Sequence, residues 1–377
     1  MSKIRISFVA DSLDFGGTAN VVRELVHGLD RDRFALQQLF LKEAGSVGTR
    51  LIEQSDNGAD ALRKGRYDVA TLFRIAGKLR SFSTDILYTV DHHNAIFWGT
   101  FASVMARTPK RVVASHTTGR IDGSPSFSRT DRWMLPRYDS IVALSASHAG
   151  YLSDTEGIPV NKIDIIENGI DPDRYEHVPP EAIQKCREEL GLTDEHFVVL
   201  MTAVMRPEKA HSVTLRVARR LIRNHRNLRV LLVGDGPLLE EVEKWISRFA
   251  LDRYIFALGR RTDVPALLKT ANVMVLPSYP AVETLPLAVI EAMASGVPVI
   301  ASAVGSVPDM IEDEYSGWLI GPADLDGLEM RLRNLIESST DTRDIVANAR
   351  KTVHERYTTA RMVQLYARLF ERLMQRE

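Results

Sequence analysis

The apolar positions along this chain alternate between two patterns, short β-rich runs and longer segments with helical spacing. In the first half, six apolar runs are separated by segments in which apolar residues recur every three to four positions. Such alternation predicts βαβ units built around a parallel sheet. The predicted strands are Ile4–Ala10, Ala35–Leu41, Asp85–Val90, Arg111–His116, Ser140–Leu144 and Ile163–Ile166, with helices that include Thr18–Leu29, Ala95–Ala106 and Ala146–Thr155.

The second half repeats this alternation with new sequence, which predicts a second sheet of the same kind. His177–Pro180, which contains a Pro-Pro pair, and the polar run after it are typical of a connection between domains. The predicted strands are Phe197–Ala203, Arg229–Val233, Tyr254–Leu258, Val273–Leu276 and Pro298–Ala301, and the predicted helices are Val213–Asn224, Leu238–Phe249, Val264–Thr270 and Leu287–Ala294.

The last segment, Arg343–Glu377, has the pattern of an amphipathic helix. A single face collects five of its apolar residues, namely Val363, Tyr366, Leu369, Phe370 and Leu373. With 377 residues, the chain is long enough for two domains. Two doubly wound sheets would bind ligands at the carboxyl ends of their strands, which predicts a cleft between the domains.

Composition and charge narrow the class of protein. The chain is 45% hydrophobic and 26% charged, which is ordinary for a globular protein, and its net charge of -1 gives no overall attraction to nucleic acid. A single cysteine, Cys186, excludes an intramolecular disulfide framework and favours a reducing compartment. The run Ile4–Ala10 is too short for a signal sequence, and no apolar stretch approaches a membrane span. We therefore expect a cytoplasmic protein, with peripheral contact at the inner membrane face left open.

The stretch from Val273 to Ser302 contains the most informative chemistry. It is predicted to form a strand, a loop, a helix that opens at Pro286, and a second strand. Free backbone amides at the helix start can bind a phosphate. Glu283 lies just before the helix and Glu291 lies inside it, and carboxylates at these positions can accept hydrogen bonds from sugar or ribose hydroxyls. The pattern indicates recognition of a sugar attached to a nucleoside diphosphate.

Seven residues separate Glu283 from Glu291, and the motifs Ala292-Met293-Ala294 and Gly296-Val297-Pro298-Val299 follow. This order resembles the signature of retaining glycosyltransferases of family four, which have the GT-B fold. The simple alternative is a buried α/β crossover whose glutamates face solvent, but the flanking Pro-Ser and Gly-x-Pro-Val-Ile elements also occur in the family's order. The resemblance extends in order from Gly16 to about Gly317.

The resemblance implies an α/β protein with two Rossmann-like domains facing across a cleft. An acceptor domain would cover residues 1–175, with helix 358–377 packing back on it, and a donor domain would cover residues 190–357. The implied reaction is transfer of a sugar from a nucleotide-sugar, with UDP as the default nucleotide, to an acceptor hydroxyl. The acceptor would be a sugar, a lipid-linked molecule or a small molecule. No metal and no cofactor are expected, because the nucleotide-sugar is itself a substrate.

The resemblance also assigns site residues on the donor side. Glu283 would hold donor sugar hydroxyls and Glu291 the ribose. Lys209 would neutralise the departing diphosphate together with amides near Leu285–Leu287. The remaining donor-binding candidates lie in glycine-rich turns after strands or at the helix start, and they are Gly16, Gly17, Gly234, Arg260, Thr284, Leu285, Pro286 and Leu287.

The chain departs from the family pattern after the first strand of the second half. Family members usually have Gly-Arg there, whereas this chain has Ala203-Val204. Lys209 occupies the expected lysine position. Arg206 could fold back and replace the missing arginine, or the activity could be weak or the donor unusual.

Three histidines follow predicted strands of the first half. A histidine that leaves the carboxyl end of a parallel strand points toward the ligand side of the sheet. The family carries a histidine like His116 close to the donor sugar and its diphosphate. His92 and His93 follow another strand, and one of them is a candidate for the acceptor side, although adjacent histidines point in different directions.

Other motifs are interpreted as structural or remain open. Asn168-Gly169-Ile170-Asp171 resembles a family element and is predicted to form a turn, with Asp171 as a cap. Asp263 and Asp324 are predicted helix caps. The stretch from Arg120 to Arg137 mixes arginines with Phe127 and Trp133, next to Tyr138, which suggests an acceptor loop or a membrane-touching patch for a lipid-linked acceptor.

Two other functions fit the same fold. A non-hydrolysing nucleotide-sugar epimerase shares the GT-B architecture but would need no acceptor. A non-catalytic nucleotide-sugar binding protein would be consistent with the loss of arginine at Val204.

Overall fold

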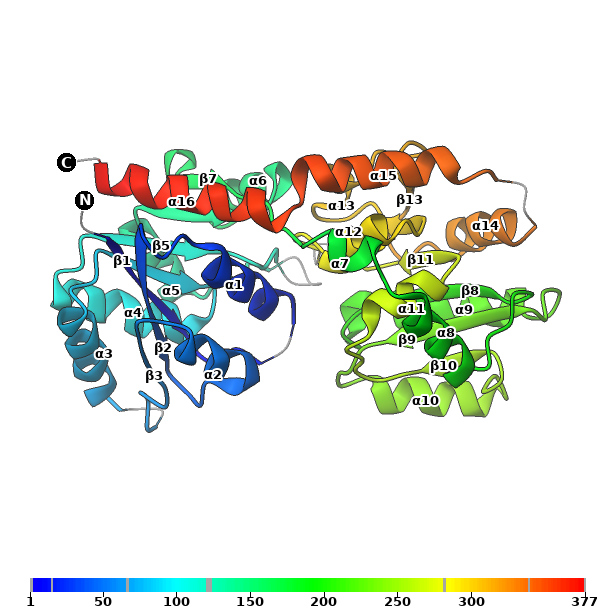
Figure 1. The fold of residues 1–377 in the computed structure, drawn as a ribbon, viewed down its shortest axis with the longest axis horizontal. Helices are drawn as coiled ribbons and strands as arrows, with labels where there is room; N and C mark the ends of the chain where they lie inside the picture. Colours follow the sequence, from blue (N-terminus) through cyan, green and yellow to red (C-terminus); the bar gives the residue numbers. More distant parts are fainter. Residues whose placement is uncertain are drawn as a thin grey trace. The chain divides into compact units, whose positions relative to one another are not determined.

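A computed structural model describes residues 3–14, 16–65, 68–119, 124–280, 283–337 and 340–375. The chain forms two compact units (Figure 1). Unit 1 consists of Met1–Gly169 and Thr359–Glu377, and unit 2 of Ile170–Thr358. Each unit contains one parallel sheet with helices on both sides, so the predicted α/β class with two doubly wound domains is confirmed.

The sheet of unit 1 has seven strands in the order β3-β2-β1-β4-β5-β6-β7, all parallel. Its strands are β1 (Ile4–Ala10), β2 (Phe34–Phe40), β3 (Asn57–Ala59), β4 (Ile86–Val90), β5 (Lys110–Ala114), β6 (Ser140–Ala143) and β7 (Ile163–Ile165). The helices are α1 (Gly17–Gly28), α2 (Gly45–Glu53), α3 (Ala70–Ser81), α4 (His93–Ala106), α5 (Arg129–Met134), α6 (Ala146–Asp154) and α16 (Thr359–Gln375), with short 3-10 turns η1 (Leu135–Arg137) and η2 (Val160–Lys162).

The sheet of unit 2 has six parallel strands in the order β10-β9-β8-β11-β12-β13. Its strands are β8 (Phe197–Thr202), β9 (Leu228–Val233), β10 (Ile255–Ala257), β11 (Val273–Leu276), β12 (Val299–Ser302) and β13 (Trp318–Ile320). The helices are α7 (Asp173–Glu176), α8 (Pro180–Glu189), α9 (His211–Leu221), α10 (Leu239–Arg248), α11 (Val264–Thr270), α12 (Leu287–Ser295), α13 (Val307–Met310), α14 (Leu325–Ile336) and α15 (Arg343–Arg356), with the 3-10 turn η3 (Pro207–Lys209).

The inner strands of both sheets are largely apolar because both of their faces are covered. In β6, Ile141, Val142 and Ala143 are all fully buried. This burial explains why the strands appear in the sequence as continuous apolar runs rather than as an alternation. The predicted strands fall within one or two residues of the observed ones. The edge strands β3 and β13 were not predicted, whereas the equally short edge strands β7 and β10 were.

The last helix, α16, covers one side of the sheet of unit 1. Tyr366 packs edge-on against Tyr88 with a ring-centroid distance of 5.9 Å, and Phe370 packs edge-on against Phe34 and Tyr88, each at 6.2 Å. All five apolar residues that the sequence aligns on one face of this helix are buried. The amphipathic pattern of the segment is therefore confirmed.

The final segment is not the single helix predicted from Arg343 to Glu377. Tyr357 and Thr358 separate α15 from α16. The backbone N–H of Ile170 donates to the carbonyl oxygen of Tyr357 at 2.9 Å, and Ile170 also forms a parallel bridge with Thr358. This long-range pairing takes the two residues out of helical geometry. Residue 377, the predicted end, lies outside the described residues.

The segment predicted to connect the domains also differs. The two units divide between Gly169 and Ile170, so residues 170–175, expected in the first domain, belong to unit 2. The polar run after Pro179 forms α8, which packs on α11. Cys186 Sγ donates to the carboxylate of Asp263 at 3.2 Å, and Arg261 pairs with both Asp263 and Glu189. Asp263 thus binds these partners and does not cap α11 with its side chain, as the sequence suggested.

We expect Phe370→Ala to destabilise unit 1 by about 3–5 kcal/mol, because a fully buried aromatic ring in contact with three others would leave a cavity. Chemical denaturation followed by circular dichroism measures this loss. Gln364→Ala on the exposed side of α16 is the matched control and should change stability by less than about 0.5 kcal/mol. Equal effects of the two substitutions would contradict the packing described.

Candidate active site

The predicted residues Lys209 and Glu283 lie together in unit 2. The Lys209 Nζ donates to both carboxylate oxygens of Glu283, at 2.7 and 2.8 Å. Ser278 Oγ donates a third hydrogen bond to Oε1 of the same carboxylate. The Glu283 side chain is only 2% exposed and that of Lys209 is 21% exposed. The pair is therefore a largely desolvated ion pair, whose lysine follows β8 and whose glutamate follows β11 at the carboxyl edge of the sheet.

The backbone of Glu283 is held by the loop after β12. The N–H of Ser306 donates to the Glu283 carbonyl oxygen at 2.8 Å. The preceding residue, Gly305, has φ +55°, and a Cβ atom built on it would lie 1.8 Å from that carbonyl oxygen. Only glycine permits this approach without movement of the chain. Gly305 therefore positions Glu283, although the sequence analysis did not identify it.

The helix start next to Glu283 has the predicted form. Pro286 occupies the N-cap position of α12, and the helix begins at Leu287. The first N–H groups of a helix have no acceptor within the helix, so they face outward and carry partial positive charge. Thr284 and Leu285 are buried, whereas Pro286 and Leu287 are partly exposed. This helix start can bind an anion such as a diphosphate.

Two cations compensate the partial negative charge at the C-terminal end of α12. Lys269 Nζ donates to the carbonyl oxygen of Ser295 at 2.8 Å, and Arg350 Nη2 donates to the same oxygen at 3.2 Å. The helix then ends at Gly296, which has φ 75°. Positive charge at a helix C-terminus is favourable. Neither basic residue is directed to the N-terminal end, where a phosphate would bind.

Glu291, on the same helix, is partly buried. Tyr175 of α7 donates its hydroxyl hydrogen to Glu291 Oε1 at 2.9 Å. Burial raises the pKa of Glu291, and the Tyr175 hydrogen bond partly opposes that rise. The sequence analysis did not identify Tyr175. The only available signal was an aromatic residue four positions after Asp171 in the element that resembles the family.

Tyr175→Phe should raise the pKa of Glu291 further, because it removes a hydrogen bond to the ionised form. A ribose-binding carboxylate would then lose its charge earlier as the pH falls. We expect a donor KM about 3–10-fold higher at neutral pH, with the rise of KM at low pH starting at a higher pH than in the wild type. Steady-state kinetics across the acidic range measure both effects. Tyr315→Phe, at an exposed tyrosine, is the control and should leave the profile unchanged.

The loop that contains Arg206 is close to the Lys209–Glu283 pair in sequence. The Arg206 side chain is exposed and forms a long ion pair of 3.9 Å with Glu208. Val204, where the family pattern has arginine, is also exposed. The loop is held in place by the Tyr279 N–H, which donates to the Glu208 carbonyl oxygen at 2.9 Å. The substitution of Arg206 for the missing arginine stays a prediction.

Gly234 and Arg260 follow neighbouring strands, β9 and β10. A Cβ atom on Gly234, which has φ +146°, would lie 2.0 Å from the carbonyl oxygen of Ala203. The glycine is therefore required by close packing of two loops, whether or not a nucleotide approaches it. Arg260 lies 3.8 Å from Asp235 in an exposed ion pair. Their donor-binding roles stay predictions.

In unit 1, the backbone at the predicted His116 is held by Asp91, a residue that the sequence analysis missed. The carboxylate of Asp91 accepts hydrogen bonds from the backbone N–H of His116 at 2.7 Å and from the Thr117 hydroxyl at 2.9 Å. Among the described residues, no partner binds the buried Nε2 of His116. Burial lowers the pKa of His116, partly offset by Asp91, so its imidazole is neutral near pH 7.

The adjacent residues His92 and His93 have different neighbours, as expected. His92 is the N-cap residue of α4 and lies close enough to His116 to lower its pKa. His93 Nδ1 lies 2.8 Å from the carboxylate of Asp131, so its ring is turned toward α5. Of the two, His92 is the one placed near His116 and is the better acceptor-side candidate.

Gly16 and Gly17 start α1 at the same edge of the sheet. Gly16 has φ 125°, and a Cβ atom there would meet nothing within 4 Å in the described residues. The loop therefore leaves open space next to the first turn of α1. Phe15, between these glycines and Asp14, lies outside the described residues.

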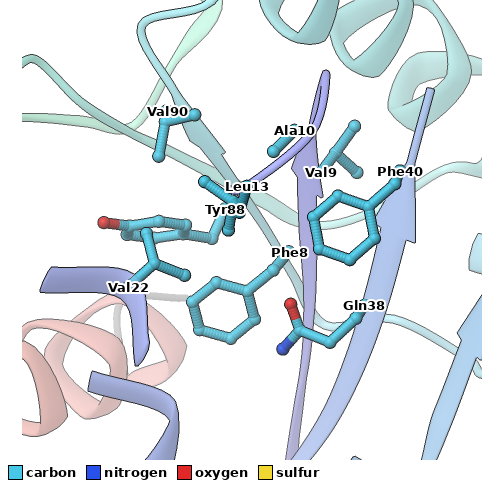
Figure 2. A pocket seen from close by; sticks show the side chains of 9 residues that line it. All are labelled: Phe8, Val9, Ala10, Leu13, Val22, Gln38, Phe40, Tyr88 and Val90. Atoms are coloured by element: carbon cyan, nitrogen blue, oxygen red, sulfur yellow. The ribbon is translucent and has the colours of Figure 1, made fainter. Parts of the chain in front are cut away.

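A small pocket in unit 1 is lined mainly by residues of β1, β2 and β4 (Figure 2). Its walls are mostly apolar, and they include Phe8, Tyr88 and the buried Gln38. Within the described part of the chain, neither polar atom of the Gln38 amide has a hydrogen-bond partner. No predicted site residue lines the pocket, so it is not part of the candidate site.

The described residues contain no group of three or more His, Cys, Asp or Glu side chains that could hold a metal ion. Across the same residues, none of the helices combines the length and apolar character needed to cross a bilayer.

Two doubly wound units define the GT-B architecture, and one of them has a lysine–glutamate pair beside a helix start. The sequence model of "Glycosyl transferases group 1" matches residues 182–352, and that of "Glycosyltransferase Family 4" matches residues 15–174. The chain belongs to glycosyltransferase family 4.

Curated relatives agree with this assignment. N-acetyl-alpha-D-glucosaminyl L-malate synthase of Bacillus anthracis is 24% identical over 311 residues, which cover 81% of this chain and 79% of the relative. UDP-Gal:alpha-D-GlcNAc-diphosphoundecaprenol alpha-1,3-galactosyltransferase of Escherichia coli is 32% identical over 171 residues, 44% of this chain and 43% of the relative.

Solved structures share the fold. Anabaena Alr3699/HepE in complex with UDP and glucose has a TM-score of 0.84 at 22% identity and covers 98% of this chain and 100% of its own. A glycosyltransferase from Rickettsia africae has a TM-score of 0.86 at 18% identity, with 100% of both chains covered. The predicted GT-B fold and the predicted family are confirmed.

Proposed function

We propose that the protein transfers a sugar from a UDP-sugar to an acceptor hydroxyl, with retention of anomeric configuration and without a metal or cofactor. The observation that carries the proposal is the desolvated Lys209–Glu283 pair at the start of α12. Unit 2 would bind the donor and unit 1 would bind the acceptor with His92, whereas His116 keeps the role next to the donor sugar that the family resemblance implies.

Each polar group has a task in this reaction. The third donor of the Lys209 ammonium and the first N–H groups of α12 would stabilise negative charge on the departing diphosphate. Glu283 would orient the sugar through its hydroxyls, and Glu291 would accept hydrogen bonds from the ribose. The acceptor oxygen bonds to the anomeric carbon on the face that the diphosphate leaves, and its proton passes to a diphosphate oxygen. Neither glutamate is assigned as a nucleophile.

UDP is the proposed nucleotide because similar proteins use it. Alr3699/HepE was crystallised with UDP and with UDP-glucose, and the name of the Escherichia coli relative contains UDP-Gal. That relative's name also contains a diphosphoundecaprenol, which supports a lipid-linked acceptor as one candidate. Sugars and small molecules remain the other acceptor classes.

A thermal-shift screen of UDP, GDP and ADP tests the donor assignment, because a ligand that binds only the folded state raises its melting temperature. We expect a selective shift with UDP that is reduced in Glu291→Gln. The same shift with all three nucleotides, or none with any, would refute selective UDP binding. Activity should persist in EDTA if no metal is needed.

Incubation with UDP-sugars in the absence of acceptor distinguishes the other functions. A transferase should slowly release UDP by hydrolysis. Formation of an epimerised sugar nucleotide would indicate an epimerase instead. Binding without turnover across a broad acceptor panel would indicate a binding protein, and either of these results overturns the proposal.

A further inference from the structure

The outer side of unit 1 exposes large apolar side chains on three helices. Phe73 of α3 is 62% exposed, Phe101 and Val104 of α4 are 39% and 54% exposed, and Trp133 of α5 is 56% exposed. The inner side of α4 is also apolar, since Ala95 and Ala102 are fully buried in the core. A helix that is apolar on both sides is suited to an apolar or interfacial neighbour on its outer side.

The helices that carry Phe73 and Phe101 are neighbours. Both helices pack on the same side of the parallel sheet and precede neighbouring strands, so they run in the same direction. Arg80 Nη2 donates to the carbonyl oxygen of Met105 at 2.5 Å, which aligns the two helix ends. Phe73 and Phe101 therefore lie on two helices that pack side by side and run in the same direction.

Aromatic contacts continue this surface along α4. The ring of Phe97 lies 5.2 Å from that of Phe101 and 5.1 Å from that of Trp98. Trp133 lies on the neighbouring helix α5, and the guanidinium of Arg137, in the turn η1 that follows, stacks on the Trp133 ring at 3.8 Å. We call the surface formed by Phe73, Phe101, Val104 and Trp133, with the exposed Arg80, Arg107, Arg129 and Arg137, the α3–α5 face.

The exposed charged side chains that define this face are all positive. The only acidic residue within α3, α4 and α5 is Asp131, which is buried and bonded to Ser128 and His93. The four arginines of the face therefore have no exposed acidic neighbour on these three helices. A second copy of the chain would bring basic residues against basic residues in a two-fold contact, which is unfavourable.

We propose that the α3–α5 face docks on the headgroup region of an anionic phospholipid membrane. Aromatic side chains prefer the interface between headgroups and acyl chains, and arginines bind lipid phosphates while their stems remain in apolar surroundings. Each basic residue near an anionic surface adds attraction that salt screens. Of the residues expected in a membrane-touching patch, Trp133 belongs to this face, whereas Phe127 and Tyr138 are buried and residues 120–123 lie outside the described part.

This inference goes beyond the proposed function, and it does not depend on catalysis. Docking of this face also bears on the acceptor, because the candidate acceptor residues His92 and His93 lie at the start of α4. A face that docks on a membrane would place these candidate acceptor residues close to lipid-linked molecules.

Flotation with lipid vesicles tests the proposal on the full-length protein. We expect binding to vesicles of phosphatidylcholine and phosphatidylglycerol in equal parts, little binding to phosphatidylcholine alone, and release at high salt. Phe73→Ser with Phe101→Ser should lower the partition coefficient at least about tenfold. Val160→Ser with Met330→Ser, which removes two exposed apolar residues elsewhere, should leave it unchanged.

A second pair of variants tests the charges separately from the apolar residues. Arg129→Glu with Arg137→Glu should lower binding to anionic vesicles at least about tenfold, whereas Arg216→Glu with Arg223→Glu, at exposed positions of unit 2, should not. Circular dichroism confirms that each variant is folded. Absence of vesicle binding, equal binding to both lipid mixtures, or equal losses in the control variants would overturn the proposal. So would a finding that the face forms a stable protein–protein contact instead. None of these readouts requires sugar transfer, so failure of the proposed function would be seen independently.

Discussion

Lys209→Ala should lower kcat by about 10²–10³-fold and destabilise the fold by about 3–5 kcal/mol. The first loss follows from removal of the positive charge proposed to stabilise the diphosphate. The second follows because Glu283, which is 2% exposed, would keep a buried negative charge without its partner. Steady-state kinetics with a UDP-sugar and denaturation curves measure the two losses.

A double substitution separates the two causes. Lys209→Met together with Glu283→Gln removes both charges, so most of the lost stability should return while activity stays low. Lys244→Met, which breaks an exposed pair with Glu240, is the control and should change stability by less than about 1 kcal/mol. If the double variant recovers activity as well, Lys209 has only a structural role and the proposed mechanism is wrong.

Gly305→Ala should abolish most activity although Gly305 is not expected to touch the substrate. Its Cβ atom would lie 1.8 Å from the Glu283 carbonyl oxygen, so the loop or the Glu283 backbone must move. A displacement of this size at a substrate-positioning residue can cost about 10²-fold in rate. Kinetics and a melting curve measure the effect, and we expect the melting temperature to fall as well.

Gly191→Ala is the matched control for this substitution. Gly191 belongs to the same unit and has φ +61°, close to the +55° of Gly305, but nothing lies within 4 Å of its Cβ position among the described residues. It should therefore show only the cost of a left-handed backbone conformation, about 1–2 kcal/mol, with unchanged kcat. Equal kinetic losses in both variants would show that contact with Glu283 is not the cause.

Val204 occupies the position at which the family pattern has arginine, and the structure shows the surroundings of the neighbouring Arg206. The sequence suggests that Arg206 could fold back to replace the missing arginine, and in the structure its exposed side chain forms an ion pair with Glu208 at 3.9 Å. Arg206→Ala kinetics test the remaining prediction. A turnover equal to that of the wild type would show that Lys209 and the helix amides suffice without a second cation.

Much of the fold could be predicted because its elements have strong local signals. The strands Ile4–Ala10 and Val273–Leu276 and the helix Val264–Thr270 were predicted with their exact bounds, since buried parallel strands are continuously apolar and Pro265 marks a helix start. Glu283 and Lys209 were found because their motifs resemble those of the family. The helix α8 was not predicted because its sequence is polar. Contacts of Cys186 with Asp263 and of Glu189 with Arg261, just before α11, hold it in place.

The sequence by itself determined the alternation of strands and helices, the two sheets and the helix start beside Glu283, because hydrophobic periodicity and turn residues act over a few neighbouring positions. Only the tertiary structure decided that Lys209 reaches Glu283 across 74 residues, that Tyr175 holds Glu291 and that Gly305 supports Glu283. It also decided that the chain divides at Gly169 and that the last segment breaks at Tyr357. These features depend on contacts between residues distant in sequence, which packing of the whole domain creates and which no local pattern contains.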